Sequence, residues 1–268
     1  MVEDASAHQQ LAMGKGAGMK NKTHFWRNTI CGTVALAIVG AAPALAKHIC
    51  KNEERDAAMT LHHMHTMLDH GLIMVLQGAD LRMLSTLNTA PGIDQATAAH
   101  GSKMISEGKA TIREMLSGSH MRRMHEQGRW SDPQMSYTHE LGAAMLAVVD
   151  DVDHLAPSDT AFPDRIRMCH IRIALNHALE MAAEGANLAM LGKMAMAGGI
   201  DAYSVTHGHK MIIDARKLWD EIIGGHAMKE IHSSRTSPEI SAQMPQIQRM
   251  AKDGDKLLVL LEKMDTAK

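Results

Sequence analysis

The chain has 268 residues, which is enough for one or two compact domains with real cores. Its 28 Lys and Arg residues nearly balance 30 Asp and Glu residues, so it lacks the strongly basic field that draws proteins to nucleic acid. It contains 24 Met and 18 His but only 3% aromatic residues, so methionine and small aliphatic side chains must fill the space that Phe and Tyr usually fill.

Residues 1–46 read as an N-terminal extension that carries an export signal. A basic segment, MKNKTHFWRN, begins at Met19 and precedes an apolar stretch that ends in Ala44-Leu45-Ala46, a small-x-small cleavage pattern. We expect Lys47 to be the first mature residue of a periplasmic protein that has no stable membrane insertion. An uncleaved membrane anchor is the alternative, because the apolar stretch approaches the length of a membrane span.

Two cysteines remain after removal of this segment, Cys50 and Cys169. In an oxidising compartment two thiols either pair or bind a soft metal, and their spacing in the sequence does not decide between these outcomes.

The most informative feature is an internal repeat. Residues 61–125 align with residues 168–232 without a gap and share about 23 identities in about 65 positions. This predicts a tandem duplication, with module 1 at 47–155, a Pro-containing linker at 156–163 and module 2 at 164–268.

Apolar residues recur at helical spacing through both modules, and nothing reads as a strand. We therefore predict an all-α fold with three helices in each module, joined either into one six-helix body or into two adjacent bundles. The expected first helices are 56–87 and 164–196; the second begin with Asp94 and Asp201 as N-caps and stop at Gly118 and Gly225; the third begin near Ser131 and Ser237 and end near Leu155 and Met264. A short exposed helix is expected around Met121 and His125.

Histidine and methionine recur together at helical spacing in both copies. In the first helices they stand seven and four residues apart, and in the second helices four apart, so each row projects from one side of its helix. The predicted metal ligands are His63, His70, Met74, His100 and Met104 in module 1, and His170, His177, Met181, His207 and Met211 in module 2.

Imidazole and thioether donors together suit copper, and thioethers select Cu(I) or Ag(I) because they are soft. The leading hypothesis is a soft-metal chaperone, buffer or tolerance factor in the periplasm. One alternative is a b-type haem electron carrier with axial His and Met ligands. The other is a metal-free structural or interaction protein, in which the methionines fill the core.

Enzymatic motifs are missing from the sequence. It contains no Glu-x-x-His pair of the di-iron bundles, no His-Glu-x-x-His, no glycine-rich phosphate loop and no Gly-x-Ser-x-Gly. We therefore do not expect an enzyme, although a triad assembled from distant residues leaves no such signature.

Two segments carry a resemblance to known proteins. The pattern Met59-Thr60-Leu61-His62-His63, followed by a Met-containing helix, resembles a family of exported, ferritin-like helical proteins of unknown function. The segment LNHALEMAAEGANLAML with HGHKMI resembles uncharacterised bacterial proteins rich in Met and His. The resemblance covers the repeated modules alone and implies a periplasmic bundle that handles metal. Copy two departs from it, because Cys169-His170 replaces the paired histidines.

Overall fold

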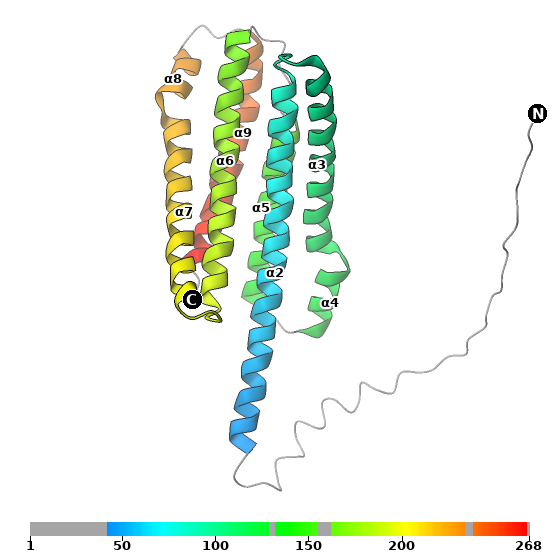
Figure 1. Cartoon of the computed structure of the whole chain (residues 1–268), viewed down its shortest axis with the longest axis vertical. Coiled ribbons are helices and arrows are strands. Elements are labelled where there is room, and N and C mark those ends of the chain that lie inside the picture. Colours follow the sequence, from blue (N-terminus) through cyan, green and yellow to red (C-terminus); the bar gives the residue numbers. More distant parts are fainter. Residues whose placement is uncertain (1–41, 129–131, 155–161, 234–237, 267–268) are drawn as a thin grey trace, which may run out of the picture. The chain divides into compact units, whose positions relative to one another are not determined.

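A computed structural model describes residues 42–128, 132–154, 162–233 and 238–266. In these ranges every regular element is an α-helix, which confirms the all-α prediction (Figure 1). The long helices are α2 (Ala42–Ser85), α3 (Pro91–Ser117), α5 (Asp132–His154), α6 (Phe162–Lys193), α7 (Gly199–Gly224) and α9 (Pro238–Thr266). The short helices are α4 (Ser119–Gln127) and α8 (His226–Ser233).

Two predicted segments fall largely outside the described residues. These are the export signal, of which residues 1–41 are not described, and the linker, of which residues 155–161 are not described. Among the helices that are described, none is both long enough and apolar enough to cross a membrane.

The predicted N-caps Asp94 and Asp201 are wrong by about one turn. The helix α3 begins at Pro91 with Ala90 as its N-cap, and the Asp94 carboxylate accepts a hydrogen bond from the Ala90 N–H at 2.9 Å. Asp201 accepts in the same way from the Ala197 N–H at 2.5 Å. Each aspartate therefore lies inside its helix and reaches back to a free donor before it, as the acidic residue of a capping box does.

Glycine contacts bring the first and second helices of each copy close together. A Cβ at Gly78 of α2 would lie 2.6 Å from the Gly101 oxygen and 2.9 Å from the Met104 Cβ of α3. At the equivalent Gly185 of α6, the distances to the Gly208 oxygen and the Met211 Cβ of α7 are 2.7 and 2.9 Å. No side chain fits between backbones at this separation, so the repeated glycines fix the helix crossing in both copies.

The two copies also bury the same positions. Every buried residue of α2 from Met64 to Ala79 has a buried counterpart 107 residues later in α6. The two helices therefore present equivalent faces to the core, which is the structural form of the sequence repeat.

The helices α2 and α6 run antiparallel to each other. The Thr66 hydroxyl, near the middle of α2, reaches the Asn187 side chain late in α6. Arg165 at the start of α6 donates to the Thr86 carbonyl just after α2. Between these contacts the Asn176 amide donates to the Leu76 carbonyl. An antiparallel pair of equivalent helices places the copies in an approximate two-fold relation.

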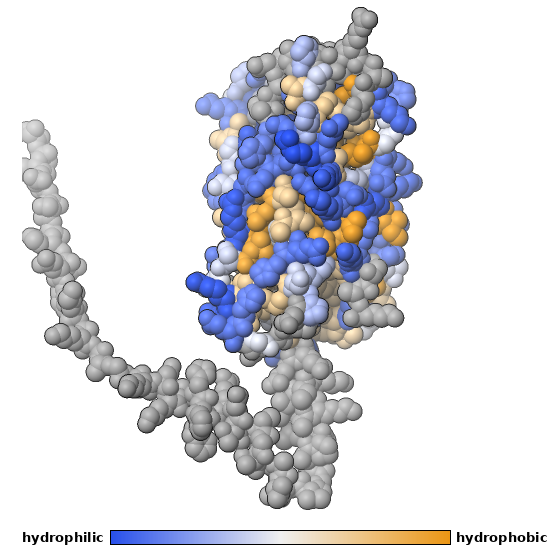
Figure 2. Space-filling model, turned by 180° about the vertical axis from the view of Figure 1, so that it is seen from behind, coloured by the Kyte–Doolittle hydropathy of each residue, from blue (hydrophilic) through white to orange (hydrophobic). Residues whose placement is uncertain are grey.

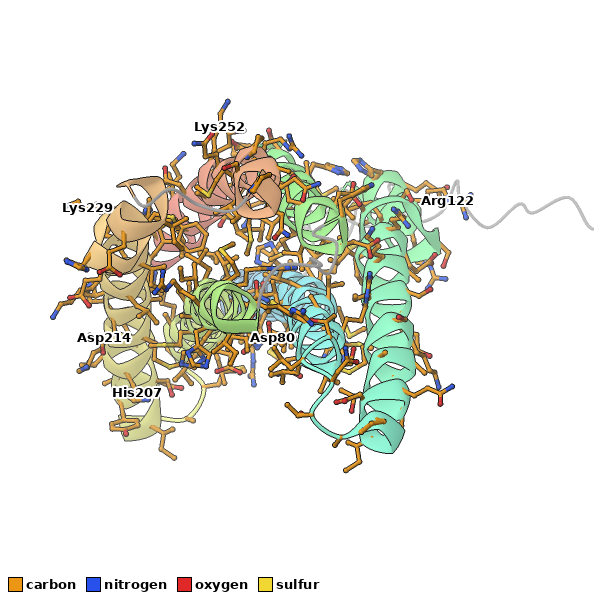
Figure 3. The ribbon with its side chains drawn as sticks, turned by 90° about the horizontal axis from the view of Figure 1, so that it is seen from above. Asp80, Arg122, His207, Asp214, Lys229 and Lys252 are labelled. Carbon is orange, nitrogen blue, oxygen red and sulfur yellow. The ribbon has the colours of Figure 1, made fainter. Side chains whose placement is uncertain are left out.

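Residues 53–268 form one compact unit, and a single hydrophobic core includes residues of both modules. Viewed from above, α2 and α6 lie side by side at the centre, α3 and α7 lie outside them, and α5 and α9 cover one side (Figure 3). Of the two arrangements that the sequence leaves open, the structure has the single body. The surface seen from behind shows apolar patches between hydrophilic ones (Figure 2).

Equivalent cations fasten the outer helices to the third helix of each copy. The Lys109 ammonium of α3 lies 3.0 Å from Asp150 and 2.7 Å from Asp153 of α5. Its counterpart Arg216 of α7 lies 2.8 Å from Glu262 of α9. Since Lys109 is mostly buried, its ion pairs are less screened than ordinary surface pairs.

Two pairs of polar residues cross the buried contact between α2 and α6, and they occupy the same repeat positions. The Asn176 amide donates to the Asp80 carboxylate at 2.6 Å. Asp69 lies beside Asn187, whose amide favours the charged carboxylate, but no described group makes a hydrogen bond of ordinary geometry to either carboxylate oxygen. Copy one supplies both aspartates and copy two both asparagines. Two identical copies would instead place carboxylate against carboxylate, which is unfavourable.

We predict that Gly78→Ala lowers the free energy of unfolding by at least about 2 kcal/mol, because the new methyl group forces α2 and α3 apart. Urea denaturation measures the change. Gly92→Ala is the control, because a Cβ at Gly92 has nothing within 4 Å, and it should leave stability within about 0.5 kcal/mol of the wild type. Equal effects of the two substitutions would contradict the close crossing.

We also predict that Asn176→Asp destabilises the protein by about 2 kcal/mol or more at pH 8, because it places a second carboxyl beside Asp80. Asp80→Asn in the same chain should restore part of the loss by exchanging the two members of the pair. If the changes in the free energy of unfolding caused by the two substitutions simply add in the double variant, the two residues do not face each other.

Candidate functional site: a cavity beside His65

The structure places the predicted histidine ligands on the surface. The six are His63, His70, His100, His170, His177 and His207, and all of them are exposed. His207, near the start of α7, lies far from the central contact marked by Asp80 (Figure 3).

The predicted methionine ligands, Met74, Met104, Met181 and Met211, are partly buried. Met104 and Met211 flank the glycine crossings, and Met181 packs against the core. In the described part of the chain, no group of three or more His, Cys, Asp or Glu side chains is arranged to hold a metal ion. Ligation by this set would rest on His and Met alone, and it stays a prediction.

A cavity of about 500 Å³ lies at one end of the helical body, where α2, α5, α6 and α9 meet. Most of its wall is apolar. Three methionines line it, together with His65 and Tyr137: Met190 near the end of α6, Met194 in the turn just after α6, and Met264 near the end of α9. Its volume falls in the range of about 300–1,000 Å³ that is usual for small-molecule sites.

The hydrogen bonds of His65 determine its tautomer. The Thr138 hydroxyl donates its proton to the Gln134 carbonyl at 2.9 Å, so it can only accept from the His65 Nε2, which lies 3.0 Å away. The Nε2 atom therefore carries the proton, and Nδ1 keeps its lone pair. Nδ1 is buried, and no described group hydrogen-bonds to it. Leaving such an acceptor without a partner costs about 1–3 kcal/mol.

Burial keeps the imidazole neutral. Desolvation lowers the pKa of His65 to about 4, and the neighbouring His62 adds to the effect. Burial also raises the pKa of Asp69, one turn later on α2, so its carboxyl group favours the neutral form. Tyr137 packs edge-on against the His65 ring with centroids 5.9 Å apart, and burial raises its pKa as well. His65, Asp69 and Tyr137 are thus neutral polar groups beside the cavity, while Lys193 and Lys263 carry positive charge at its wall.

The opposite end of the body contains the equivalent region of the other copy, and it has diverged. A cavity of about 140 Å³ there is lined by Met83, the counterpart of Met190, and by Arg172, the counterpart of His65. Arg172 is buried. Val152 lines this cavity from α5, where the larger Met264 lines the other cavity from α9. One end therefore has a large cavity lined by a histidine, and the other has a small cavity lined by an arginine.

Sequence reasoning passed over His65 because it sought residues kept in both copies. The sequence signal that marks His65 is a polar residue that lies on the apolar face of a helix and is replaced by a different residue, Arg172, in the other copy. Two further expectations concern Cys169 and Met121. Cys169, the counterpart of His62, carries a free buried thiol, and the side chain of Cys50 lies outside the described part of the chain. Met121 of α4 is buried, although the sequence suggests an exposed helix.

Comparison of the chain with protein-family models, with curated proteins and with solved structures finds no match.

We predict that His65 stays neutral, with its proton on Nε2, from pH 8 down to about pH 5, because burial opposes protonation. The unfolded chain takes up this proton near pH 6.5, so the contribution of His65 to stability falls as the pH drops from about 6.5 towards 4. Nitrogen-15 NMR of the imidazole rings reads both tautomer and titration. A His65 ring that titrates near pH 6.5, or that carries its proton on Nδ1, would contradict the assignment.

Proposed function

We propose that the protein binds a soft monovalent metal ion, Cu(I) or Ag(I), in the cavity beside His65, and that it acts in the periplasm as a chaperone, buffer or tolerance factor. The observation that carries the proposal is that His65, whose Nδ1 atom no described group contacts, and three methionines line the same mostly apolar cavity. The resemblance to exported Met- and His-rich proteins agrees with it.

The donor set suits these ions. The thioether sulfurs of Met190, Met194 and Met264 are soft and uncharged, and they favour Cu(I) and Ag(I) over the harder divalent ions. A monovalent ion with neutral ligands also brings a single charge into the cavity, which lowers the desolvation cost compared with a divalent ion. We infer that the cavity selects soft monovalent ions over harder divalent ions.

His65 needs no deprotonation before it binds metal. Because its pKa is lowered to about 4 by burial, its lone pair is available throughout the neutral and mildly acidic range. Occupation of Nδ1 by a metal would also satisfy the acceptor that no described group contacts. Loading at this residue should therefore change little between pH 5 and pH 8.

We test the proposal by anaerobic titration of the full chain with Cu(I) against a competing chelator. We expect one tightly bound ion, and we expect His65→Gln and Met190→Leu each to weaken binding by about tenfold or more. Met83→Leu is the matched control, because Met83 occupies the same repeat position at the other cavity and the substitution nearly conserves volume.

A second variant separates the cavity from the surface histidines. It replaces His63, His70, His170 and His177 by Ala, and we expect its affinity to equal that of the wild type. Loss of binding in this variant with no loss in His65→Gln would move the site to the surface. If neither the wild type nor any variant competes with the chelator, the proposed function is wrong.

The volume of the cavity favours a second candidate, a b-type haem. A volume of about 500 Å³ is more than a single ion needs, and Lys193 and Lys263 at the wall supply positive charge for propionate groups. His65 with one methionine would be the axial pair. Titration with haemin decides this: a shifted Soret band that His65→Gln abolishes supports haem, and a spectrum identical to free haemin removes it.

A further inference from the structure

Two histidines from different helices meet head to head on the surface, away from the cavity. The Nε2 atoms of His125 on α4 and His139 on α5 lie 3.2 Å apart. Their ring centroids are 5.5 Å apart and the ring planes differ by 22°. His125 is exposed and His139 is half-buried, so both are accessible from solvent.

We propose that this pair is a second metal site, a two-histidine chelate for a borderline divalent ion of the Zn²⁺ or Cu²⁺ class. Two nitrogens bound at about 2.0–2.1 Å to a tetrahedral ion lie about 3.3–3.4 Å from each other, which is close to the present separation. The two remaining positions on the ion are left for water.

The rings need to tilt but not to separate. In the structure they share one proton in an N–H···N hydrogen bond, so one Nε2 already offers its lone pair. The ring that carries the Nε2 proton must shift it to its own Nδ1, a change of tautomer with no net loss of a proton. Both rings then present Nε2 lone pairs, and each must rotate away from the line that joins them. Exposed side chains can make this movement.

The pair joins a short helix to a long one. The nine-residue helix α4 is anchored beside it by Met121, which is only 2% exposed. The charged neighbours of the histidines along these two helices are Arg122, Arg123 and Glu126 on α4 and Glu140 on α5. All four are exposed, and solvent screens them. An ion at this position would fasten α4 to α5.

Isothermal titration of the full chain with Zn²⁺ tests the site, with His125→Gln, His139→Gln and the double variant. A chelate predicts that either substitution weakens zinc binding by about tenfold and that the second adds little, because one remaining imidazole is a poor ligand. His170→Gln is the control, since His170 is also an exposed helical histidine. Unchanged isotherms in the single variants, or fully additive losses, would overturn the proposal.

A second measurement reads the site directly. On addition of Zn²⁺, the ring nitrogen signals of His125 and His139 should shift together in NMR spectra, while that of His170 stays in place. Shifts of all the exposed histidines in parallel would show nonspecific binding and overturn the site. The outcome is independent of the cavity, because His65→Gln should weaken Cu(I) binding and leave the zinc site intact.

Discussion

The antiparallel contact between α2 and α6 determines the arrangement of the other helices. Each of these helices must pack against its own second helix at a glycine crossing and against the opposite copy at the centre. The repeated sequence meets both requirements, because it places buried residues at equivalent positions of the two helices. In the polar pairs Asp80 with Asn176 and Asp69 with Asn187, copy one supplies the aspartate and copy two the asparagine. Because both copies lie in one chain, they can carry different residues at the same repeat position.

This arrangement explains why the two ends of the body differ. An approximate two-fold relation generates the same surroundings twice, once at each end, and later substitutions need not be shared. At one end His65 and Met190 line a cavity of about 500 Å³, and at the other Arg172 and Met83 line one of about 140 Å³. One end of the body therefore has a candidate binding site, and the other has a buried guanidinium.

Local features were predictable from the sequence because they depend on neighbours in the chain. The helical content follows from periodicity. The stops at Gly118 and Gly225 follow from glycines that have no Cβ to collide with the carbonyl oxygens of Glu114 and Glu221 in the preceding turn. The offset of Asp94 from its expected capping position is a small error of the same local kind, since an acidic residue near a helix start can cap from either side of it.

The candidate sites were not predictable in this way. His65 meets Thr138 across 73 residues of sequence, and its burial depends on three other helices. The contact of His125 with His139 depends on how α4 folds back onto α5. Retention between copies marked histidines that the structure leaves exposed, because spacing along a helix shows which residues share a face but not what covers that face.

The most direct measurement is anomalous diffraction from crystals of the full chain loaded with one equivalent of Ag(I), a stable stand-in for Cu(I). The account predicts one strong silver peak in the cavity between α2, α5, α6 and α9, within bonding distance of the His65 Nδ1 atom and of at least one methionine sulfur. A peak on the exposed histidines of α2 and α6, with the cavity empty, would contradict it.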